Sequence, residues 1–122
     1  MKQHSNSFLD LVENALKEVG ELGVKDLKDK INNKEEFILI DVREESEWNK
    51  GKIPGSMYLG KGIIERDIET SIPNKQQEMV LYCQGGFRSA LAAKSLKEMG
   101  YMNVLSLKGG FGEWVNSKYP VN

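Results

Sequence analysis

Residues 79–96 read MVLYCQGGFRSALAAKSL, and they carry the clearest signal of the fold in this chain. The first four are short, uniformly apolar and include a β-branched valine, which is typical of a strand buried on both faces. Gly85 and Gly86 then allow a tight turn, and an alanine-rich run at helical spacing starts at Ala90. The stretch therefore predicts a strand, a glycine-bearing turn and a helix in direct succession.

The rest of the chain repeats this alternation. Apolar runs predict strands at 37–40, 79–82 and 103–107, with a brief one at 56–59. Helical periodicity predicts helices at 7–19, after Gly23, at 62–70, at 90–99 and at 111–119. We therefore expect an α/β fold with a central parallel sheet flanked by helices on both faces. Residues 20–122 are expected to form one domain, and residues 1–19 an amphipathic helical extension.

Composition places the chain among globular domains. Its 122 residues suffice for one core, and 17 basic against 18 acidic side chains give a net charge of −1. Because neither sign dominates and no long basic run occurs, we expect neither a nucleic acid nor a membrane as a partner. The sequence shows no signal peptide and no apolar stretch of about 18 residues, so we expect a cytoplasmic location.

The only cysteine, Cys83, lies in the turn between the strand and the helix. A single thiol excludes an intramolecular disulfide and a zinc site built on several thiolates. Backbone N–H groups from Gln84 through Ser89 can converge on the sulfur, the helix N-terminus adds partial positive charge, and Arg88 adds a full one. These groups favour the thiolate, which is the nucleophilic form. The alternative is that Cys83 is a small buried apolar residue, because free cysteine is among the most buried residue types.

Three ordered motifs resemble those of the rhodanese family of sulfurtransferases. The first comprises DVRE at 41–44, Glu47-Trp48 and GKIPGS at 51–56. The second is CQGGFRS at 83–89, which is similar to the family's active-site loop. The third comprises Gly100-Tyr101, Asn103-Val104, LKGG at 107–110 and Trp114. Because three motifs occur in order over about residues 20–119, the resemblance is far more specific than one glycine loop.

The resemblance implies a rhodanese-like domain that acts as a thiosulfate sulfurtransferase. Cys83 would take the outer sulfur of thiosulfate or of a persulfide donor, and its own persulfide would pass that sulfur to a thiol, cyanide or a protein. The resemblance implies neither a metal nor an organic cofactor. The residues expected to bind the substrate are Gln84, Gly85, Gly86, Phe87, Arg88, Ser89, Asp41 and Arg43.

The sequence supports some further expectations and leaves some alternatives open. Asp41 and Arg43 could orient the loop or reach the donor, but Arg43 could equally pair with a nearby carboxylate. His4 is expected in a disordered terminus, so no Cys–His pair is expected. Related phosphatases use a loop one residue longer than the four residues between Cys83 and Arg88, which favours sulfur transfer. A module that relays sulfur between proteins, with little activity on thiosulfate, is the main alternative.

Overall fold

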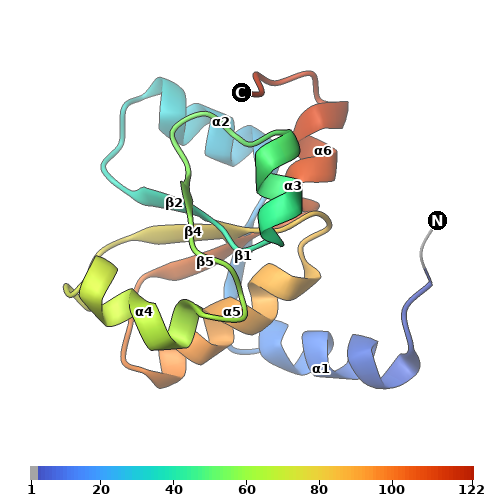
Figure 1. The fold of residues 1–122 in the computed structure, drawn as a ribbon, viewed down its shortest axis with the longest axis vertical. Coiled ribbons are helices and arrows are strands. Elements are labelled where there is room, and N and C mark those ends of the chain that lie inside the picture. The colour runs from blue at the N-terminus through green and yellow to red at the C-terminus, as the bar shows by residue number, and fades with distance from the viewer. Residues whose placement is uncertain (1–2) are drawn as a thin grey trace.

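The computed structural model describes residues 3–122, which form a sheet of five strands with helices on both faces (Figure 1). The strands are β1 (Gly20–Leu22), β2 (Ile38–Asp41), β3 (Met57–Tyr58), β4 (Met79–Tyr82) and β5 (Val104–Leu107). They lie in the order β1-β5-β4-β2-β3, and every neighbouring pair is parallel. The predicted α/β class and its parallel sheet are confirmed.

The helices form two layers. Helices α2 (Val24–Asn32) and α6 (Gly110–Asn116) cover one face of the sheet, and α4 (Ile64–Ser71) and α5 (Phe87–Glu98) cover the other. The short α3 (Glu45–Lys50) follows β2, and α1 (Asn6–Leu16) packs against the outer side of α5 (Figure 1). The Cys83 loop therefore lies where β4 ends and α5 begins.

Strand β4 consists of four apolar residues because both of its faces are buried. Met79 and Leu81 point into the core cluster that includes α4 and α5, whereas Val80 and Tyr82 point into the cluster that includes α2 and α6. Side chains alternate between the two faces of a strand, and here both faces are covered. All four residues are fully buried. This burial anchors the strand end from which Cys83 projects.

The sequence-based prediction missed β1 and placed some helix ends wrongly. Strand β1 has only three residues, lies at the edge of the sheet and exposes Gly20 and Glu21, so it lacks an apolar run. Its register is set by pairing with β5, which only the folded chain supplies. Helix α5 starts at Phe87, three residues before the expected Ala90, because the turn ends at Gly86 in the left-handed conformation.

Helix α1 is held by a small core of its own. Val12 and Ala15 are buried against Ala90 of α5, with Phe8 and Phe87 packed at the margin. The boundary at residue 20 between an extension and a domain stays a prediction. Within the described residues, no helix is long and apolar enough to cross a membrane.

Candidate active site

The sulfur of Cys83 lies at the N-terminal end of α5. The backbone N–H of Gly86 donates to Sγ at 3.1 Å, and the N–H of Ser89 donates to it at 3.4 Å. No side chain caps this helix through its N-cap residue, Gly86, so the sulfur accepts hydrogen bonds that a capping oxygen usually accepts. Backbone donors and the helix dipole both favour negative charge at this position. The geometry suits a thiolate or an anionic sulfur attached to Cys83.

The sequence left open whether Cys83 is a reactive thiol or a small buried residue, and its surroundings have features of both. The residue is 1% exposed and belongs to the apolar cluster between the sheet and α4–α5, as a small buried residue would. Its sulfur is nevertheless directed at N–H groups, and the residue lines an open cleft. Of the amides from Gln84 to Ser89, those of Gly86 and Ser89 reach the sulfur among the described contacts. Fewer N–H groups therefore reach the sulfur than the sequence indicated.

A buried pair of hydroxyl groups lies beneath the sulfur. Ser89 Oγ lies 3.5 Å from Cys83 Sγ and 2.8 Å from the Oγ of Ser106, which belongs to β5. Both serines are fully buried. Ser106 was not among the predicted site residues, although a serine inside the apolar run of β5 was a signal that it has a polar partner.

The loop backbone is held in place from the side of α6. The N–H of Phe111 donates to the carbonyl of Cys83 at 2.8 Å, and the N–H of Gly112 donates to the carbonyl of Gln84 at 3.0 Å. Gly86 has φ +97°, and a Cβ on it would lie 3.2 Å from the backbone of the β5–α6 turn. Only glycine fits that conformation and that space without strain. The start of α6 is thus part of the structure that positions the sulfur.

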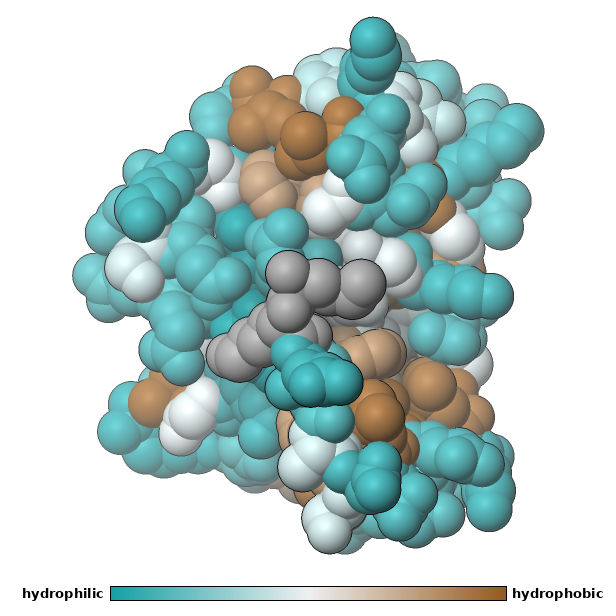
Figure 2. Space-filling view, turned by 90° about the vertical axis from the view of Figure 1, so that its right-hand side faces the viewer, coloured by the Kyte–Doolittle hydropathy of each residue, from teal (hydrophilic) through white to brown (hydrophobic). Residues whose placement is uncertain are grey.

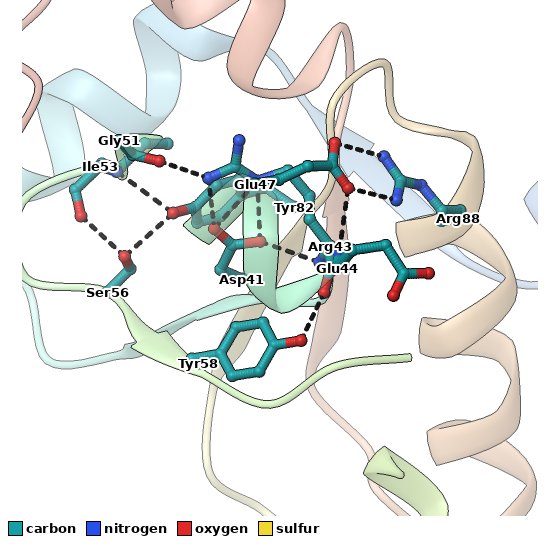
Figure 3. A network of polar contacts seen from close by, with 10 residues as sticks. All are labelled: Asp41, Arg43, Glu44, Glu47, Gly51, Ile53, Ser56, Tyr58, Tyr82 and Arg88. Atoms are coloured by element: carbon teal, nitrogen blue, oxygen red, sulfur yellow. Dashed lines mark hydrogen bonds and ion pairs between the residues drawn. The ribbon is translucent and has the colours of Figure 1, made fainter. Parts of the chain in front are cut away.

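Arg88 does not point freely toward a substrate. Its two terminal nitrogens donate to the carboxylate of Glu47 on α3, at 2.8 and 3.1 Å (Figure 3). The hydrogen bonds from Arg88 lower the pKa of Glu47, and in return the pKa of Arg88 is raised. The positive charge that the sequence assigned to the loop is therefore largely balanced by a carboxylate.

Asp41 and Arg43 form a buried pair instead of lining the Cys83 cleft. The Arg43 guanidinium donates to both oxygens of Asp41, at 2.7 to 3.0 Å, and to the carbonyl of Gly51 at 2.6 Å (Figure 3). It also lies 4.3 Å from the centre of the Phe111 ring. Both residues are at most 3% exposed. The open alternative that Arg43 pairs with a nearby carboxylate is confirmed, and a role in substrate binding stays a prediction.

Tyr82 joins the same network from β4. Its hydroxyl accepts from the N–H of Ile53 at 3.2 Å and lies 3.0 Å from Ser56 Oγ (Figure 3). Burial raises the pKa of Tyr82 to about 12, so this hydroxyl keeps its proton under ordinary conditions. These bonds fix the turn after α3, and hence the position of the helix that carries Glu47.

A cleft of about 840 Å³ opens over Cys83. Five of the predicted residues line it, namely Cys83, Gln84, Gly85, Phe87 and Arg88. Its other walls come from Glu44 and Glu47 and, unexpectedly, from the N-terminal segment through Gln3, His4, Ser5 and Phe8. The expectation that His4 lies in a disordered terminus is wrong, because its ring centre lies 5.0 Å from that of Phe8 and 5.1 Å from that of Phe87.

A metal does not feature in this arrangement. Across residues 3–122, no group of three or more histidine, cysteine, aspartate or glutamate side chains is placed to hold one. The chemistry that the site offers is that of one sulfur at a helix N-terminus, with backbone donors and hydroxyl groups around it.

Comparison with known proteins agrees with the motifs and the geometry. The model of the rhodanese-like domain matches residues 23–117. The chain belongs to the rhodanese-like domain family. This chain is 37% identical to YtwF of Bacillus subtilis, named as a candidate sulfurtransferase, over 86% of this chain and 99% of that protein. It is 32% identical to a sulfurtransferase of Allochromatium vinosum, over 84% and 94% of the two chains.

One similar solved structure extends over the whole chain. A protein of unknown function from Rhodopseudomonas palustris, described as a possible tyrosine phosphatase, superposes with a TM-score of 0.85 at 30% identity. The alignment covers 100% of this chain and 99% of that one. The similarity therefore includes α1, which lies outside the residues that the family model matches.

Proposed function

We propose that this rhodanese-like protein transfers sulfane sulfur through a persulfide on Cys83. One observation carries the proposal: two backbone N–H groups at the start of α5 point at the sulfur, at 3.1 and 3.4 Å. Such donors stabilise the Cys83 thiolate before it attacks the donor. They stabilise it again when it is re-formed as the leaving group in the second step. We place the activity in the cytoplasm, where a free thiol stays reduced.

The cycle has two steps. The Cys83 thiolate attacks the outer sulfur of thiosulfate, the S–S bond of the donor breaks, and sulfite leaves with the bonding electrons. A nucleophilic acceptor, which is a thiol, cyanide or another protein, then attacks the outer sulfur of the Cys83 persulfide and releases the thiolate. A persulfide donor can replace thiosulfate, with a thiolate as the leaving group. This sequence predicts ping-pong kinetics.

The other residues of the loop support the sulfur. Ser89 offers an N–H and a hydroxyl, and Ser106 orients that hydroxyl from β5. Arg88 fastens the loop to α3 through Glu47, and its guanidinium faces the cleft from that position. Asp41 and Arg43 act as positioning residues that hold the segment leading to α3.

Mass spectrometry of the intact protein tests the proposal. After incubation with thiosulfate or with a low-molecular-weight persulfide, we expect an adduct of about 32 Da, the mass of one sulfur atom, on Cys83. The Cys83→Ser variant should show neither the adduct nor transfer of sulfur to cyanide. A wild-type protein that takes up no sulfur from either donor would refute the assignment.

A sulfur relay is the second candidate, and one observation favours it. Arg88 is engaged by Glu47, so the described lining of the cleft offers no unpaired arginine to the sulfonate end of thiosulfate. Slow loading from thiosulfate together with fast loading from a protein persulfide would identify a relay. Phosphate ester hydrolysis ranks third, and turnover of an aryl phosphate by wild type but not by Cys83→Ser would support it.

A further inference from the structure

We propose that the molecule with which Cys83 exchanges sulfur is a cysteine in a polypeptide segment, with a basic residue next to that cysteine. The inference rests on the proposed function, because it names the class of partner that the Cys83 persulfide serves. Three features of the cleft carry it: its size, the aromatic wall supplied by the N-terminal segment, and the sign of its unpaired charge.

The cleft is larger than a small sulfur anion requires. It measures about 840 Å³, and a second hollow of about 480 Å³ shares Phe8, Glu44 and Arg88 with it. Sites for ligands of many atoms span about 300–1,000 Å³, whereas thiosulfate has only a few atoms. The two hollows adjoin, so an extended chain has room on either side of a cysteine that reaches Cys83.

The aromatic wall suits an organic partner. The rings of His4, Phe8 and Phe87 lie with their centres 5.0 to 6.1 Å apart at the edge of the cleft. Such rings offer contact area to the carbon atoms of a peptide, and little to a small hydrated dianion. On this side of the molecule, apolar side chains form small groups set among hydrophilic ones (Figure 2). The surface therefore fits a short segment that combines apolar and polar contacts.

The charge of the cleft favours a basic segment. Among the described residues that line it, the charged side chains are Glu44, Glu47 and Arg88, and Arg88 is paired with Glu47. Glu44 is exposed and has no cationic partner among the described ion pairs, and a persulfide on Cys83 adds further negative charge. Lys61 lines the second hollow and is not among the residues that line the cleft over Cys83. These charges attract a lysine or arginine beside the reacting cysteine more strongly than they attract an anionic partner.

The exchange balances without an oxidant. The partner's thiolate attacks the outer sulfur of the Cys83 persulfide, and a new S–S bond forms on the partner. The bond between that sulfur and Cys83 Sγ breaks, and its electron pair stays on Sγ, where hydrogen bonds donated by the N–H groups of Gly86 and Ser89 stabilise the negative charge. The outer sulfur carries its negative charge to the partner, so the total charge is unchanged.

Three blocked tripeptides provide the test, each with cysteine between two lysines, two glutamines or two glutamates. The protein is loaded with inorganic polysulfide and desalted, and the loss of about 32 Da from Cys83 is followed by mass spectrometry in time. We expect the lysine peptide to unload Cys83 about 2- to 5-fold faster than the glutamine peptide, and the glutamate peptide to be slowest. The preference should weaken as salt is added.

Glu44→Gln is the decisive variant, because glutamine keeps the oxygen that caps α3 and removes the charge. For each peptide we define a normalised rate, which is its rate with wild type divided by its rate with Glu44→Gln. The intrinsic reactivity of the peptide cancels in this ratio. We expect the ratio of the wild-type rate to the Glu44→Gln rate to be largest for the lysine peptide and smallest for the glutamate peptide. In His4→Ala, all three rates should fall by about 3-fold while the preference persists, whereas Leu11→Ala, an exposed substitution on α1 outside the cleft, should match wild type.

The outcomes separate the two proposals. Failure of wild type to load any sulfur would refute the persulfide mechanism itself. Loading followed by equal normalised rates for the three peptides, or by a preference for the glutamate peptide, would overturn the basic-segment proposal alone. A lysine preference that is as large in Glu44→Gln as in wild type would overturn the assignment to Glu44.

Discussion

Arg88 of the Cys83 loop and Glu47 of α3 form a two-pronged ion pair, with N–O distances of 2.8 and 3.1 Å. The pair ties the start of α5 to the segment that follows β2, across the edge of the sheet. Because hydrogen bonds from Arg88 lower the pKa of Glu47, the folded protein binds this proton less readily than the unfolded chain does. The pair therefore stabilises the fold wherever Glu47 is ionised.

Glu47→Gln should lower the free energy of unfolding by about 1 kcal/mol at neutral pH. The difference from wild type should be fully present above the usual glutamate pKa of 4.5 and should vanish as the pH falls through the lowered pKa of the folded state. Urea unfolding over a range of pH measures it. Glu69→Gln, which breaks the more exposed pair with Lys75, is the matched control and should change little. A difference for Glu47→Gln that grows in acid would contradict this account.

Gly86→Ala should damage both the fold and the reaction. Alanine at φ +97° is strained, and its Cβ would press on the backbone between Leu107 and Gly109, for a total cost of about 2–3 kcal/mol. The N–H that donates to the sulfur would move, so alkylation of Cys83 by iodoacetamide should slow by about 10-fold or more at neutral pH. Gly85→Ala meets nothing within 4 Å and should unfold at the wild-type denaturant concentration. Equal unfolding midpoints for the two variants would count against the steric argument.

Ser89→Ala and Ser106→Ala should each destabilise the protein, and their effects should not add. Each substitution leaves the remaining hydroxyl short of a buried partner, at a cost of about 1–3 kcal/mol. The double variant removes both polar groups and should cost clearly less than the two single losses combined. A double-mutant cycle from chemical unfolding gives the coupling energy. Additive losses would mean that the two hydroxyl groups do not depend on each other.

Asp41→Asn should be among the most destabilising single substitutions, because it leaves the Arg43 guanidinium buried without a counter-charge. Breaking a buried ion pair from one side costs about 3–5 kcal/mol. Asp67→Asn, which breaks the exposed pair with Arg66, should leave the stability nearly unchanged. Thermal unfolding of both variants makes the comparison. If Asp41→Asn kept wild-type stability but raised the KM for the sulfur donor, Asp41 would bind substrate instead.

Much of the fold followed from local signals. Strands β2, β4 and β5 and helix α5 could be predicted from their own residues. In each of them, the positions that the sequence marks as apolar are the positions that the fold buries. Strand β1 was not readable, since three residues at a sheet edge carry no such pattern and take their conformation from β5. Short edge strands are specified by their neighbours more than by their own residues.

Some residues of the candidate site could likewise be predicted from the local sequence, and others could not. Cys83 and the donors of Gly86 and Ser89 were expected, because a strand, a glycine turn and a helix in succession bring them together locally. The partner of Arg88 was not expected, because Glu47 is 41 residues away in the chain. The position of His4 depends on how α1 packs against α5, and nothing in the terminal sequence specifies that packing.

The hydrogen bonds from Phe111 and Gly112 to the carbonyls of Cys83 and Gln84 make the reactive centre depend on α6. They join segments that are distant in the chain, so the centre is complete only when the C-terminal helix has docked. A molecule clipped by a protease ahead of α6 would keep every side chain that touches the sulfur and still lose the support of the loop. Its reactivity toward thiol reagents would then report the integrity of a helix that never meets the substrate.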